Sequence, residues 1–502
     1  GYTWFIAEMW TCILVAIAVV CVWAWWSRRD KNLPPGPFGI PLLGCLPLLN
    51  LNCPEKKLIE MAERFGKLMT VRLGDKELVV VSDYHLVKDI FSKSEAAGRP
   101  GLFALDFLSQ QKQKQGLVFS EGAIWQETRR FTMRHLKELG VGKSAMNDII
   151  NNEVEILLEK LRDHDGQVID LGEFMMLPIL NIIWTLTTGS RVTADHKEFM
   201  EYIDDVNRNM EGFMKLIILS FLPSYLFKLV PLSLFSLSRI QKSMTWFRKY
   251  LQNHYDEMEK TWDESHPRHL MDFFILEGNK HEEKENNLNY NFNQLARLMG
   301  DLFAAGLDTT ATTTRYAFIF LLQNPEVQEK IYNEIVEVVG PSKQVHLEDR
   351  NKFNYLEAFI NEVQRYANIA PLGLLHRTLD AVKVQNYIIP KNTIVAANIQ
   401  AIHMDPQFWD EPDKFKPQRF LNADGSCRTS VPGFMPFSLG KRRCAGEALA
   451  RAELFLIIAA LVQEFKFYPY PEDTPPEMVR LPGLVIHPGP YQLLIRSRQH
   501  ND

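Results

Sequence analysis

The sequence predicts a mainly α-helical protein with a small β subdomain and an N-terminal transmembrane helix. Apolar residues recur at spacings of three and four, as on a helix with one buried face, over residues 125–140, 151–162, 293–324, 325–339, 354–366 and 447–467. Two further stretches, residues 67–82 and 382–397, are rich in β-forming residues and contain turn formers, which indicates strands. A run without charge over residues 10–26 differs from everything that follows it.

The bulk composition is that of a globular protein. The chain has 502 residues, of which 46% are hydrophobic and 23% charged, so it can bury a core without disulfide bonds. The net charge of -5 gives no sign of nucleic-acid binding. None of the six cysteines forms a CxxC pair, which argues against a zinc knuckle, and their wide spacing is unlike a disulfide scaffold. A reducing compartment fits best.

The N-terminal run is expected to be a membrane anchor, residues 1–27. At about 1.5 Å per residue, the uncharged part spans roughly 26 Å, which is enough for a thin bilayer. Arg28, Arg29 and Lys31 follow it, so the positive-inside rule places the rest of the chain in the cytoplasm. A cleaved signal peptide is the alternative, but the apolar run continues past its small-x-small site and no basic region precedes it.

A basic and proline-rich hinge, residues 28–44, is expected to join this anchor to the body of the protein. Four prolines and three glycines fall within residues 33–44, which excludes a helix or a central strand. Residues 67–82 then predict a hairpin around a Gly-Asp turn. The body, residues 45–502, is expected to be a single domain.

Two very apolar runs, residues 216–222 and 225–237, are interrupted by prolines and are too short to span a membrane. They are either core helices or a flap that dips into the membrane beside the anchor, and the sequence favours neither.

A cysteine lies in a glycine-flanked bend, residues 437–446, with the sequence FSLGKRRCAG. Cys444 could fill a gap, form a disulfide or ligate a metal. A thiolate ligand needs its charge compensated, and backbone N–H groups supply this where Gly440 and Gly446 let the chain curl around the sulfur. A helix begins just after the bend, and we expect its N-terminus to lower the pKa of Cys444.

The pattern of this bend is far more specific than the cysteine alone. It reads F-x-x-G-x-R-x-C-x-G, formed by Phe437, Gly440, Arg442, Cys444 and Gly446. It resembles the cysteine loop of the cytochrome P-450 family, the haem-thiolate monooxygenases. The resemblance implies the cytochrome P-450 fold, haem b (iron protoporphyrin IX) as the cofactor and Cys444 as the metal ligand.

The resemblance covers nearly the whole chain and is closest to the animal microsomal enzymes of the family-2 type, as seen in PPGPFGIPLLG and RRFTMRHLKELG. It implies that residues 45–502 are a haem-binding catalytic domain. It also implies that this domain is held at the endoplasmic reticulum membrane, facing the cytoplasm.

A second motif, AGLDTT at residues 305–310, lies inside the helical run 293–324. A helical glycine costs about 1 kcal/mol against alanine, but it lets a flat ligand approach the backbone. The neighbouring Asp and Thr offer a carboxyl and a hydroxyl group for proton relay, although a plain polar stripe explains the residues equally well. The resemblance places Ala305 against the haem, gives Thr309 the water chain that protonates bound dioxygen and makes Asp308 its connection to solvent.

Other positions match the haem-propionate contacts of the family, namely Trp125, Arg129, His376 and Arg442. Trp125 and Arg129 are four apart and therefore share a helix face. The chain departs from the pattern before its VFS motif, where an arginine is common. Lys112 or Lys114 is expected to substitute for it, or the contact is missing.

A third constellation pairs Glu362 with Arg365 on an otherwise apolar helix. Such a pair is usually exposed and worth little, but here it is expected to be buried and to need a third partner. Arg419 is that partner by resemblance to the Glu–Arg–Arg lock of the family, which braces the cysteine loop.

The expected reaction is the insertion of one oxygen atom of O2 into an apolar small molecule, such as a lipid, steroid, terpenoid or xenobiotic. The chain has no dinucleotide fingerprint, so its electrons are expected from NADPH through NADPH-cytochrome reductase, with cytochrome b5 as a further donor. Basic residues could dock such an acidic donor, namely Arg130, Arg134, Lys137, Lys441 and Arg443.

The substrate pocket is expected from the segments that match the recognition regions of the family, residues 100–119, 211–213, 301–309, 369–375 and 483–486. Its aromatic residues would be Phe103, Phe107 and Phe303. Two alternatives remain open. One is a haem-thiolate isomerase or dehydratase that needs no reductase, and the other is a membrane-tethered haem-binding protein without catalysis.

Overall fold

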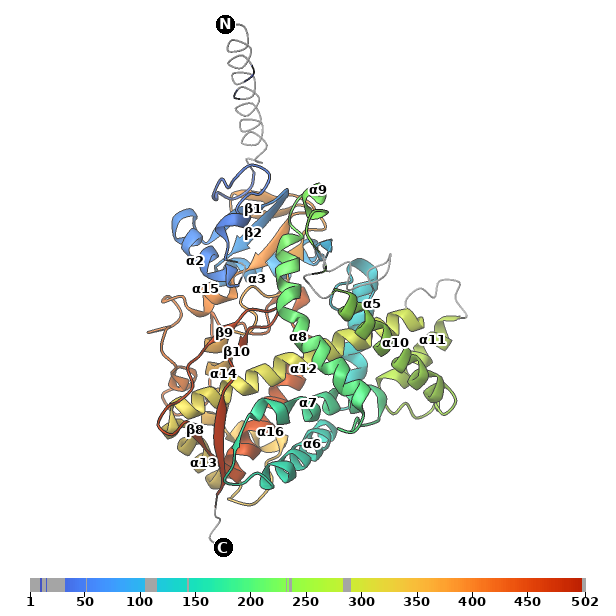
Figure 1. The fold of residues 1–502 in the computed structure, drawn as a ribbon, viewed down its shortest axis with the longest axis vertical. Coiled ribbons are helices and arrows are strands. Elements are labelled where there is room, and N and C mark those ends of the chain that lie inside the picture. Colours follow the sequence, from blue (N-terminus) through green and yellow to red (C-terminus); the bar gives the residue numbers. More distant parts are fainter. Residues whose placement is uncertain are drawn as a thin grey trace.

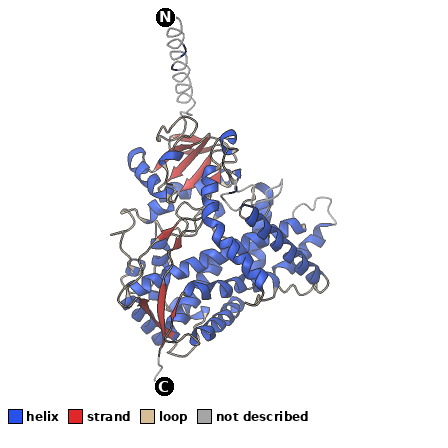
Figure 2. Ribbon diagram, viewed as in Figure 1, coloured by secondary structure: helices blue, strands red, loops and turns tan. Residues whose placement is uncertain are grey.

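The protein is described from a computed structural model over residues 10, 15, 32–50, 52–103, 115–141, 144–231, 233, 237–282 and 290–498. The expected anchor therefore lies almost wholly outside the described residues. Helices form most of the described chain, and the strands gather in small sheets at its periphery (Figure 2). The predicted mainly α fold with a small β part is confirmed.

The helices follow one another along the whole chain (Figure 1). In order they are α2 (Pro54–Phe65), α3 (Tyr84–Ser92), α5 (Gly122–Glu138), α6 (Ser144–Arg162), α7 (Leu171–Thr188), α8 (Lys197–Leu219), α9 (Ser224–Phe227), α10 (Leu237–Glu259), α11 (Leu270–Glu282), α12 (Phe292–Gln323), α13 (Pro325–Val338), α14 (Asn354–Ala367), α15 (Ile399–His403) and α16 (Glu447–Glu464). Short 3-10 helices are η1 (Leu46–Leu48), η2 (Ser94–Ala96), η4 (Leu347–Lys352), η5 (Pro417–Phe420) and η6 (Gly440–Arg442). All six predicted helices are present with ends within a few residues of the prediction, except α6, which begins at Ser144 instead of residue 151.

The largest sheet has the strand order β1-β2-β7-β4. Its strands are β1 (Leu68–Leu73), β2 (Lys76–Val81), β7 (Ile394–Ala397) and β4 (His376–Arg377). The predicted hairpin is confirmed, since β1 and β2 pair antiparallel with Leu68 opposite Val81. The predicted strand region 382–397 is also confirmed, because β5 (Val382–Val384) and β6 (Tyr387–Ile389) pair with each other and β7 runs parallel to β2. This sheet places His376 next to the centre of the molecule.

A second sheet has the order β3-β11-β8, with β3 (Val168–Ile169), β11 (Gln492–Ser497) and β8 (Phe465–Tyr470), and β9 (Arg480–Leu481) pairs with β10 (His487–Pro488). The start of β8 corrects one prediction. Residues 465–467 are predicted to end a helix, and instead they form the first part of this strand. Their apolar spacing suits a helix, but their backbone pairs with β11, where Ser497 lies opposite Phe465. A partner strand far along the chain thus overrides the local periodicity.

The core is built around α12, which crosses the middle of the molecule (Figure 1). The side chain of Asn291 accepts a hydrogen bond from the N–H of Gln294 and so caps the start of this helix. Most of its later residues are buried against α7, α14 and α16. Residues 316–322 of α12 are covered on several sides and are apolar all round, which is typical of a central helix.

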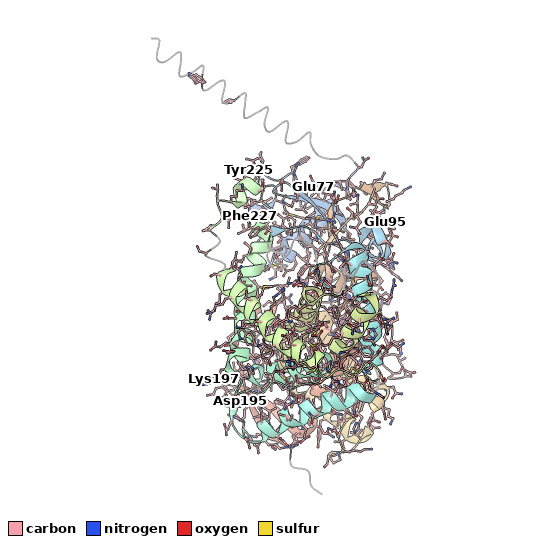
Figure 3. The ribbon with its side chains drawn as sticks, turned by 90° about the vertical axis from the view of Figure 1, so that its right-hand side faces the viewer. Glu77, Glu95, Asp195, Lys197, Tyr225 and Phe227 are labelled. Atoms are coloured by element: carbon pink, nitrogen blue, oxygen red, sulfur yellow. The ribbon has the colours of Figure 1, made fainter. Side chains whose placement is uncertain are left out.

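The two open apolar runs differ in burial. Residues 216–219 end α8, and Leu216 and Phe221 are buried in a cluster with the first sheet, so the run 216–222 belongs to the core. In the run 225–237, Tyr225 is 56% and Leu229 is 78% exposed. Figure 3 shows Tyr225 at the same end of the molecule as Glu77 of the hairpin. The second run therefore presents apolar side chains to the surroundings.

One described helix, α7, has the length and apolar composition of a membrane-crossing helix. It packs between α6 and α12, and 72% of it is buried inside the fold. It is a core helix of the catalytic body, and its composition reflects that position.

Candidate active site

A cavity of about 330 Å³ lies between α5, α7, α12, the start of α16 and the bend that carries Cys444. The structure brings nearly all of the predicted site residues to its wall, namely Ala305, Thr309, Trp125, Arg129, His376, Arg442, Phe437, Cys444 and Gly446. Gly440 and Asp308 lie just outside it. Residues from positions 99 to 454 therefore meet around one space.

The bend around Cys444 owes its shape to Gly440. This residue has φ of 75°, which is the left-handed region, and a side chain there would overlap the carbonyl oxygen of Phe91 on α3. The N–H of Cys444 donates to the carbonyl oxygen of Phe437 at 3.0 Å and closes the loop. Gly446 has an ordinary φ of -91°, so of the two glycines only Gly440 is required by the backbone.

The Cys444 thiol is accessible from the cavity, where the protein otherwise surrounds it. Burial raises the pKa of Cys444, and a backbone hydrogen bond from Gly446 and the charges of Arg129 and Arg443 oppose this rise. The expected lowering of the pKa by the helix N-terminus is therefore wrong for the protein without a bound cation, because desolvation outweighs it. A thiolate here depends on a positive partner in the cavity.

A cationic cluster lines one edge of the cavity. Arg442 is 7% exposed and donates to the carbonyl oxygens of Ala97 at 2.8 Å and Ser120 at 2.5 Å. Its guanidinium lies 3.9 Å from the centre of the Trp125 ring, a cation–π contact. Burial, and next the charge of Arg99, lower the pKa of Arg442 to about 8.

Arg99 was not predicted, and it belongs to the same cluster. It is buried and donates to the carbonyl oxygens of Val118 at 3.0 Å and Leu375 at 2.8 Å. Burial, and then the charge of Arg129, lower the pKa of Arg99 to about 10. The predicted substitutes Lys112 and Lys114 lie outside the described residues. An arginine between AAG and PG carries no local signal of burial, so the sequence could not reveal it.

Arg129 and His376 complete this edge. Arg129 donates to the carbonyl oxygen of Arg443 at 2.8 Å, and burial lowers the pKa of its guanidinium. His376 Nδ1 donates to the carbonyl oxygen of Ala96 at 2.8 Å, and its ring stacks on Phe91 at 3.7 Å. Burial, reinforced by Arg99, holds the pKa of His376 well below its usual range, so it is a neutral N–H donor.

The charges of this edge favour an anionic ligand. Three arginines, Arg99, Arg129 and Arg442, lie together, and most of their hydrogen bonds named above end on neutral carbonyl oxygens. The nearby carboxylate of Glu121 is engaged by Arg377, with 2.6 Å between Oε1 and Nη2. Buried like charges are costly without compensation. The arrangement therefore suits a ligand that brings carboxylates to this edge and a cation to Cys444, which is the donor set that haem requires.

The opposite wall of the cavity is one face of α12. Ala305, Thr309 and Thr313, at spacings of four, line it together with Gly306. Thr309 Oγ1 donates to the carbonyl oxygen of Ala305 at 2.6 Å, which leaves its lone pairs free to accept a hydrogen bond from the cavity side. A hydroxyl group thus faces the space across from the thiol wall.

Gly306 has a packing role in addition to the expected one. A side chain at this position would overlap Ile183 Cδ1 of α7. The glycine therefore allows α7 and α12 to pack closely. Because Ala305 and Gly306 are small, they also leave space in the cavity beside α12. The structure thus adds helix packing as a second reason for the glycine, which also lies in the cavity wall.

Asp308 lies on the neighbouring face of α12 and is not among the residues that line the cavity. Its carboxyl group is 4% exposed and lies next to β10. One helical position rotates a side chain by about 100°, which turns Asp308 away from the cavity that Thr309 faces. The pair predicted as a unit is thus split between the cavity and its back wall.

Glu453 on α16 is a second unpredicted residue. It is buried and lines the cavity, where the Thr310 hydroxyl donates to its Oε2 at 3.0 Å. Burial raises the pKa of Glu453 to about 8, so its carboxyl group is largely protonated at neutral pH. Its signal was present in the sequence as one acidic residue inside an otherwise apolar helix.

The predicted pocket aromatics do not line the cavity. Phe303 is 2% exposed and packs on Trp184, with ring centres 4.9 Å apart, so its assignment to the pocket is wrong. Phe103 is partly exposed and packs on Phe227 at 4.8 Å. Phe107 lies outside the described residues, as do the side chains of residues 211–213. Within the described chain the lining near α12 is aliphatic, with Val118, Leu302, Ile369, Ala370 and Leu374.

The buried charge triad is confirmed. Arg365 meets Glu362 through two hydrogen bonds of 2.7 and 2.8 Å, and Arg419 reaches the same carboxylate at 3.1 Å. Both members of the first pair have no exposed surface. Arg365 also donates to the carbonyl oxygen of His403, whose Nε2 accepts from the N–H of Met435 at 3.1 Å. The triad is thus connected to the segment that leads into the Cys444 bend.

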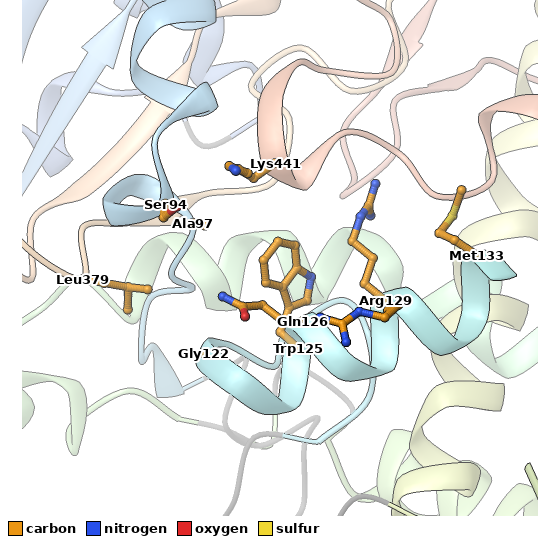
Figure 4. Close-up of a pocket in the computed structure, with 10 residues that line it drawn as sticks. Ser94, Ala97, Gly122, Trp125, Gln126, Arg129, Met133, Leu379 and Lys441 are labelled. Atoms are coloured by element: carbon orange, nitrogen blue, oxygen red, sulfur yellow. The ribbon is translucent and has the colours of Figure 1, made fainter. Parts of the chain in front are cut away.

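The predicted basic surface borders a second cavity of about 510 Å³, which opens between α5 and the Cys444 bend (Figure 4). Arg130 and Lys441 line this second cavity and are exposed. Trp125 and Arg129, which also line the first cavity, form part of its wall. Arg134 pairs with Glu277 at 3.1 Å, so part of its charge is neutralised. The surface remains cationic near the thiol side of the site.

Comparisons with known proteins agree with this geometry. A family model described as Cytochrome P450 matches residues 34–495. The chain is 34% identical to Cytochrome P450 2E1 of Oryctolagus cuniculus over 497 residues, which is 97% of each chain. It is 32% identical to Cytochrome P450 2L1 of Panulirus argus, covering 94% of this chain and 96% of that protein, and 33% identical to Cytochrome P450 2H1 of Gallus gallus, covering 96% and 97%.

Proposed function

The chain belongs to the cytochrome P450 family, and on that premise we propose that Cys444 is the thiolate that holds its haem. Members of this family are haem-thiolate monooxygenases, and that is the class of this enzyme. The observation that carries the assignment is the position of the Cys444 thiol. It opens into a cavity that also has a cationic edge and a small-residue wall on α12.

The residues around the cavity fit the cofactor. Arg99, Arg129 and Arg442 would hold the two propionates, with His376 and Trp125 beside them. Bound haem supplies the redox chemistry that activates O2. The cationic edge orients the macrocycle by its carboxylates, and the wall at Ala305 leaves room for a flat group. The positive iron would also provide the partner that favours the thiolate form of Cys444.

Proton delivery is assigned to α12. Thr309 presents its hydroxyl to the cavity and can accept a hydrogen bond from water while it donates to Ala305. Asp308 holds its carboxyl group on the back of the same helix, close enough along the chain to pass a proton to water near Thr309. The two residues therefore connect the cavity to the opposite side of α12.

The substrate is proposed to be an apolar small molecule, because the described lining near α12 is aliphatic. Electrons are proposed to come from NADPH through NADPH-cytochrome reductase, with cytochrome b5 as a second donor. The exposed cations Arg130, Lys137 and Lys441 form the surface that would attract an acidic partner.

The chain is proposed to consist of an anchor at residues 1–27, a hinge at 28–44 and a haem-binding catalytic domain at 45–502. The exposed apolar residues support attachment of this domain to the endoplasmic reticulum membrane from the cytoplasmic side. They gather in and just after the hinge and around α9, namely Phe38, Ile40, Leu42, Leu48, Tyr225 and Leu229. Gly74 of the hairpin touches Phe221 at the end of α8, which brings these two segments to one end of the molecule.

The proposed function is tested by reconstitution with a reductase, NADPH and a lipid extract, followed by a search for products heavier by one oxygen atom. Thr309→Ala is expected to bind haem normally but to form about tenfold less product per NADPH and more hydrogen peroxide, because its hydroxyl no longer holds the proton-donating water. Equal product yield would contradict the role of Thr309. Turnover of a hydroperoxide without reductase, and no oxygenated product with it, would instead identify an isomerase.

The role of Arg99 is tested through haem retention. Arg99→Gln is expected to speed haem loss to an excess of a haem-scavenging apoprotein by about tenfold or more, because a hydrogen bond to a charged group contributes about 1.5–3 kcal/mol. Arg130→Gln is the matched control, since Arg130 is exposed on the neighbouring helix α5. Haem loss from Arg99→Gln at the rate of the control would show that Arg99 serves the fold alone.

A further inference from the structure

We propose that His487 is the positioning residue for Asp308, and that it holds the carboxyl group in place behind the proton-delivery wall. The inference rests on the proposed role of Asp308 in proton delivery and names the residue on which that role depends. Nothing in the sequence patterns singled out His487, which lies in the short strand β10.

The contact is formed by two elements far apart in the sequence. His487 Nε2 lies 3.3 Å from Asp308 Oδ1, and Nδ1 of the same ring lies 3.3 Å from Thr312 Oγ1. Asp308 and Thr312 are four apart on α12 and share a face that lies beside the cavity face. The imidazole therefore touches two successive turns of the helix, next to the face that carries Thr309 and Thr313.

Burial makes this contact important for Asp308. The side chain of Asp308 is 4% exposed, and among the described residues neither its Oδ2 nor the facing Nε2 of His487 has a hydrogen-bond partner, so the two groups meet as a close ion-pair contact. Within those residues His487 is the one ionic partner found for this carboxyl group. A buried carboxyl group that lacks donors is unstable in its charged form, so loss of the imidazole would leave it without a fixed orientation.

His487 itself is well placed to act as a fixed support. Its side chain is 22% exposed, so the ring reaches from the buried carboxyl group toward the surface. The position of the strand is fixed one residue earlier by a backbone hydrogen bond, in which the N–H of Ile486 donates to the carbonyl oxygen of Ile369 at 2.8 Å. If Thr312 donates its hydroxyl proton to Nδ1, Nε2 carries the ring hydrogen on the side of Asp308, where a small rotation of the ring would turn it toward Oδ1.

The test uses the haem-loaded enzyme and compares two substitutions at one position. His487→Leu removes the donor, and His487→Gln keeps an amide N–H at about the place of Nε2. His487→Leu is expected to lower the product formed per NADPH by about twofold to fivefold, the range of a partly exposed ion pair, with a matching rise in peroxide. His487→Gln is expected to remain close to the parent enzyme.

A matched control is offered by His266, whose Nδ1 lies 3.1 Å from Asp263 Oδ2 on the surface. His266→Leu breaks a His–Asp pair of similar length far from the site and is expected to change neither coupling nor product yield. A loss in this control equal to that in His487→Leu would overturn the proposal.

Asp308→Asn separates the inference from the proposed function. If His487 acts through Asp308, adding His487→Leu to Asp308→Asn lowers the product formed per NADPH no further than Asp308→Asn alone. The shifts in thermal unfolding midpoint of the two single variants are then not additive in the double variant. Leakage in Asp308→Asn but not in His487→Leu, or losses that multiply, would overturn the inference alone. Full coupling in Asp308→Asn would refute the role of Asp308 and the inference with it.

Discussion

Cys444→Ser is expected to abolish the absorption band that thiolate-ligated haem shows in its ferrous–CO form. A serine hydroxyl is a far weaker ligand than a thiolate, and no other described residue that lines the cavity carries a sulfur atom. The N–H of residue 444 would still close the loop on Phe437, so the change removes the ligand and leaves the local backbone intact. The spectrum of the purified protein after reduction and exposure to CO measures this directly.

Cys427→Ser is the matched control for this experiment. Cys427 is partly buried in the cluster that contains Trp409 and Phe420, and burial raises the pKa of its thiol to about 11. It is expected to be a packed, protonated cysteine, so the serine variant should keep the full band. A thiolate-type band that survives Cys444→Ser would refute the assignment of the ligand, and every role proposed around the cavity would need to be revised.

Glu362→Gln is expected to cause the largest loss of stability, because it breaks a fully buried charge triad. The variant leaves Arg365, which has no exposed side-chain surface, and Arg419 without their shared carboxylate. Removing one partner of a buried pair typically costs about 3–5 kcal/mol. The loss is expected as a marked drop in the thermal unfolding midpoint, together with a lower haem content, because Arg365 is linked through His403 to Met435 before the Cys444 bend.

Glu60→Gln provides the comparison for an exposed pair. Glu60 meets Lys57 at 2.6 Å on the surface of α2, with both side chains largely exposed, and its removal is expected to leave the midpoint nearly unchanged. Where Glu362→Gln yields no folded protein, Arg419→Lys keeps a positive charge beside Glu362 and is expected to show a smaller loss. Unchanged stability in both triad variants would contradict the structural role of the triad.

Local patterns were sufficient for much of the fold. The hairpin at residues 67–82 and the helix that became α12 were predicted because alternation and helical spacing depend on neighbours along the chain. The prediction failed at residues 465–467, where pairing with β11 decides the structure. The two apolar runs near α8 and α9 could not be told apart, because their burial depends on contacts with the hairpin.

The site shows the same division. The motif around Cys444 identified the family because it is short and specific. The pKa direction of Cys444 was nevertheless wrong, since desolvation by the surrounding fold exceeds the effect of the helix terminus. The pair Asp308 and Thr309 was recognised, but its division between two faces of α12 became visible only with the neighbours of that helix in place.

By itself the sequence determined the haem-thiolate motif, the course of the main helices and the Glu362–Arg365 pair, because each depends on residues a few positions apart or on a spacing that one helix preserves. Tertiary structure alone decided that Arg99 joins Arg442, that Glu453 meets Thr310 and that His487 stands behind Asp308. Helical spacing shows which residues share a face, but it does not show which distant element covers that face. Burial and charge pairing, and hence the chemistry of each group, depend on which distant element covers the face.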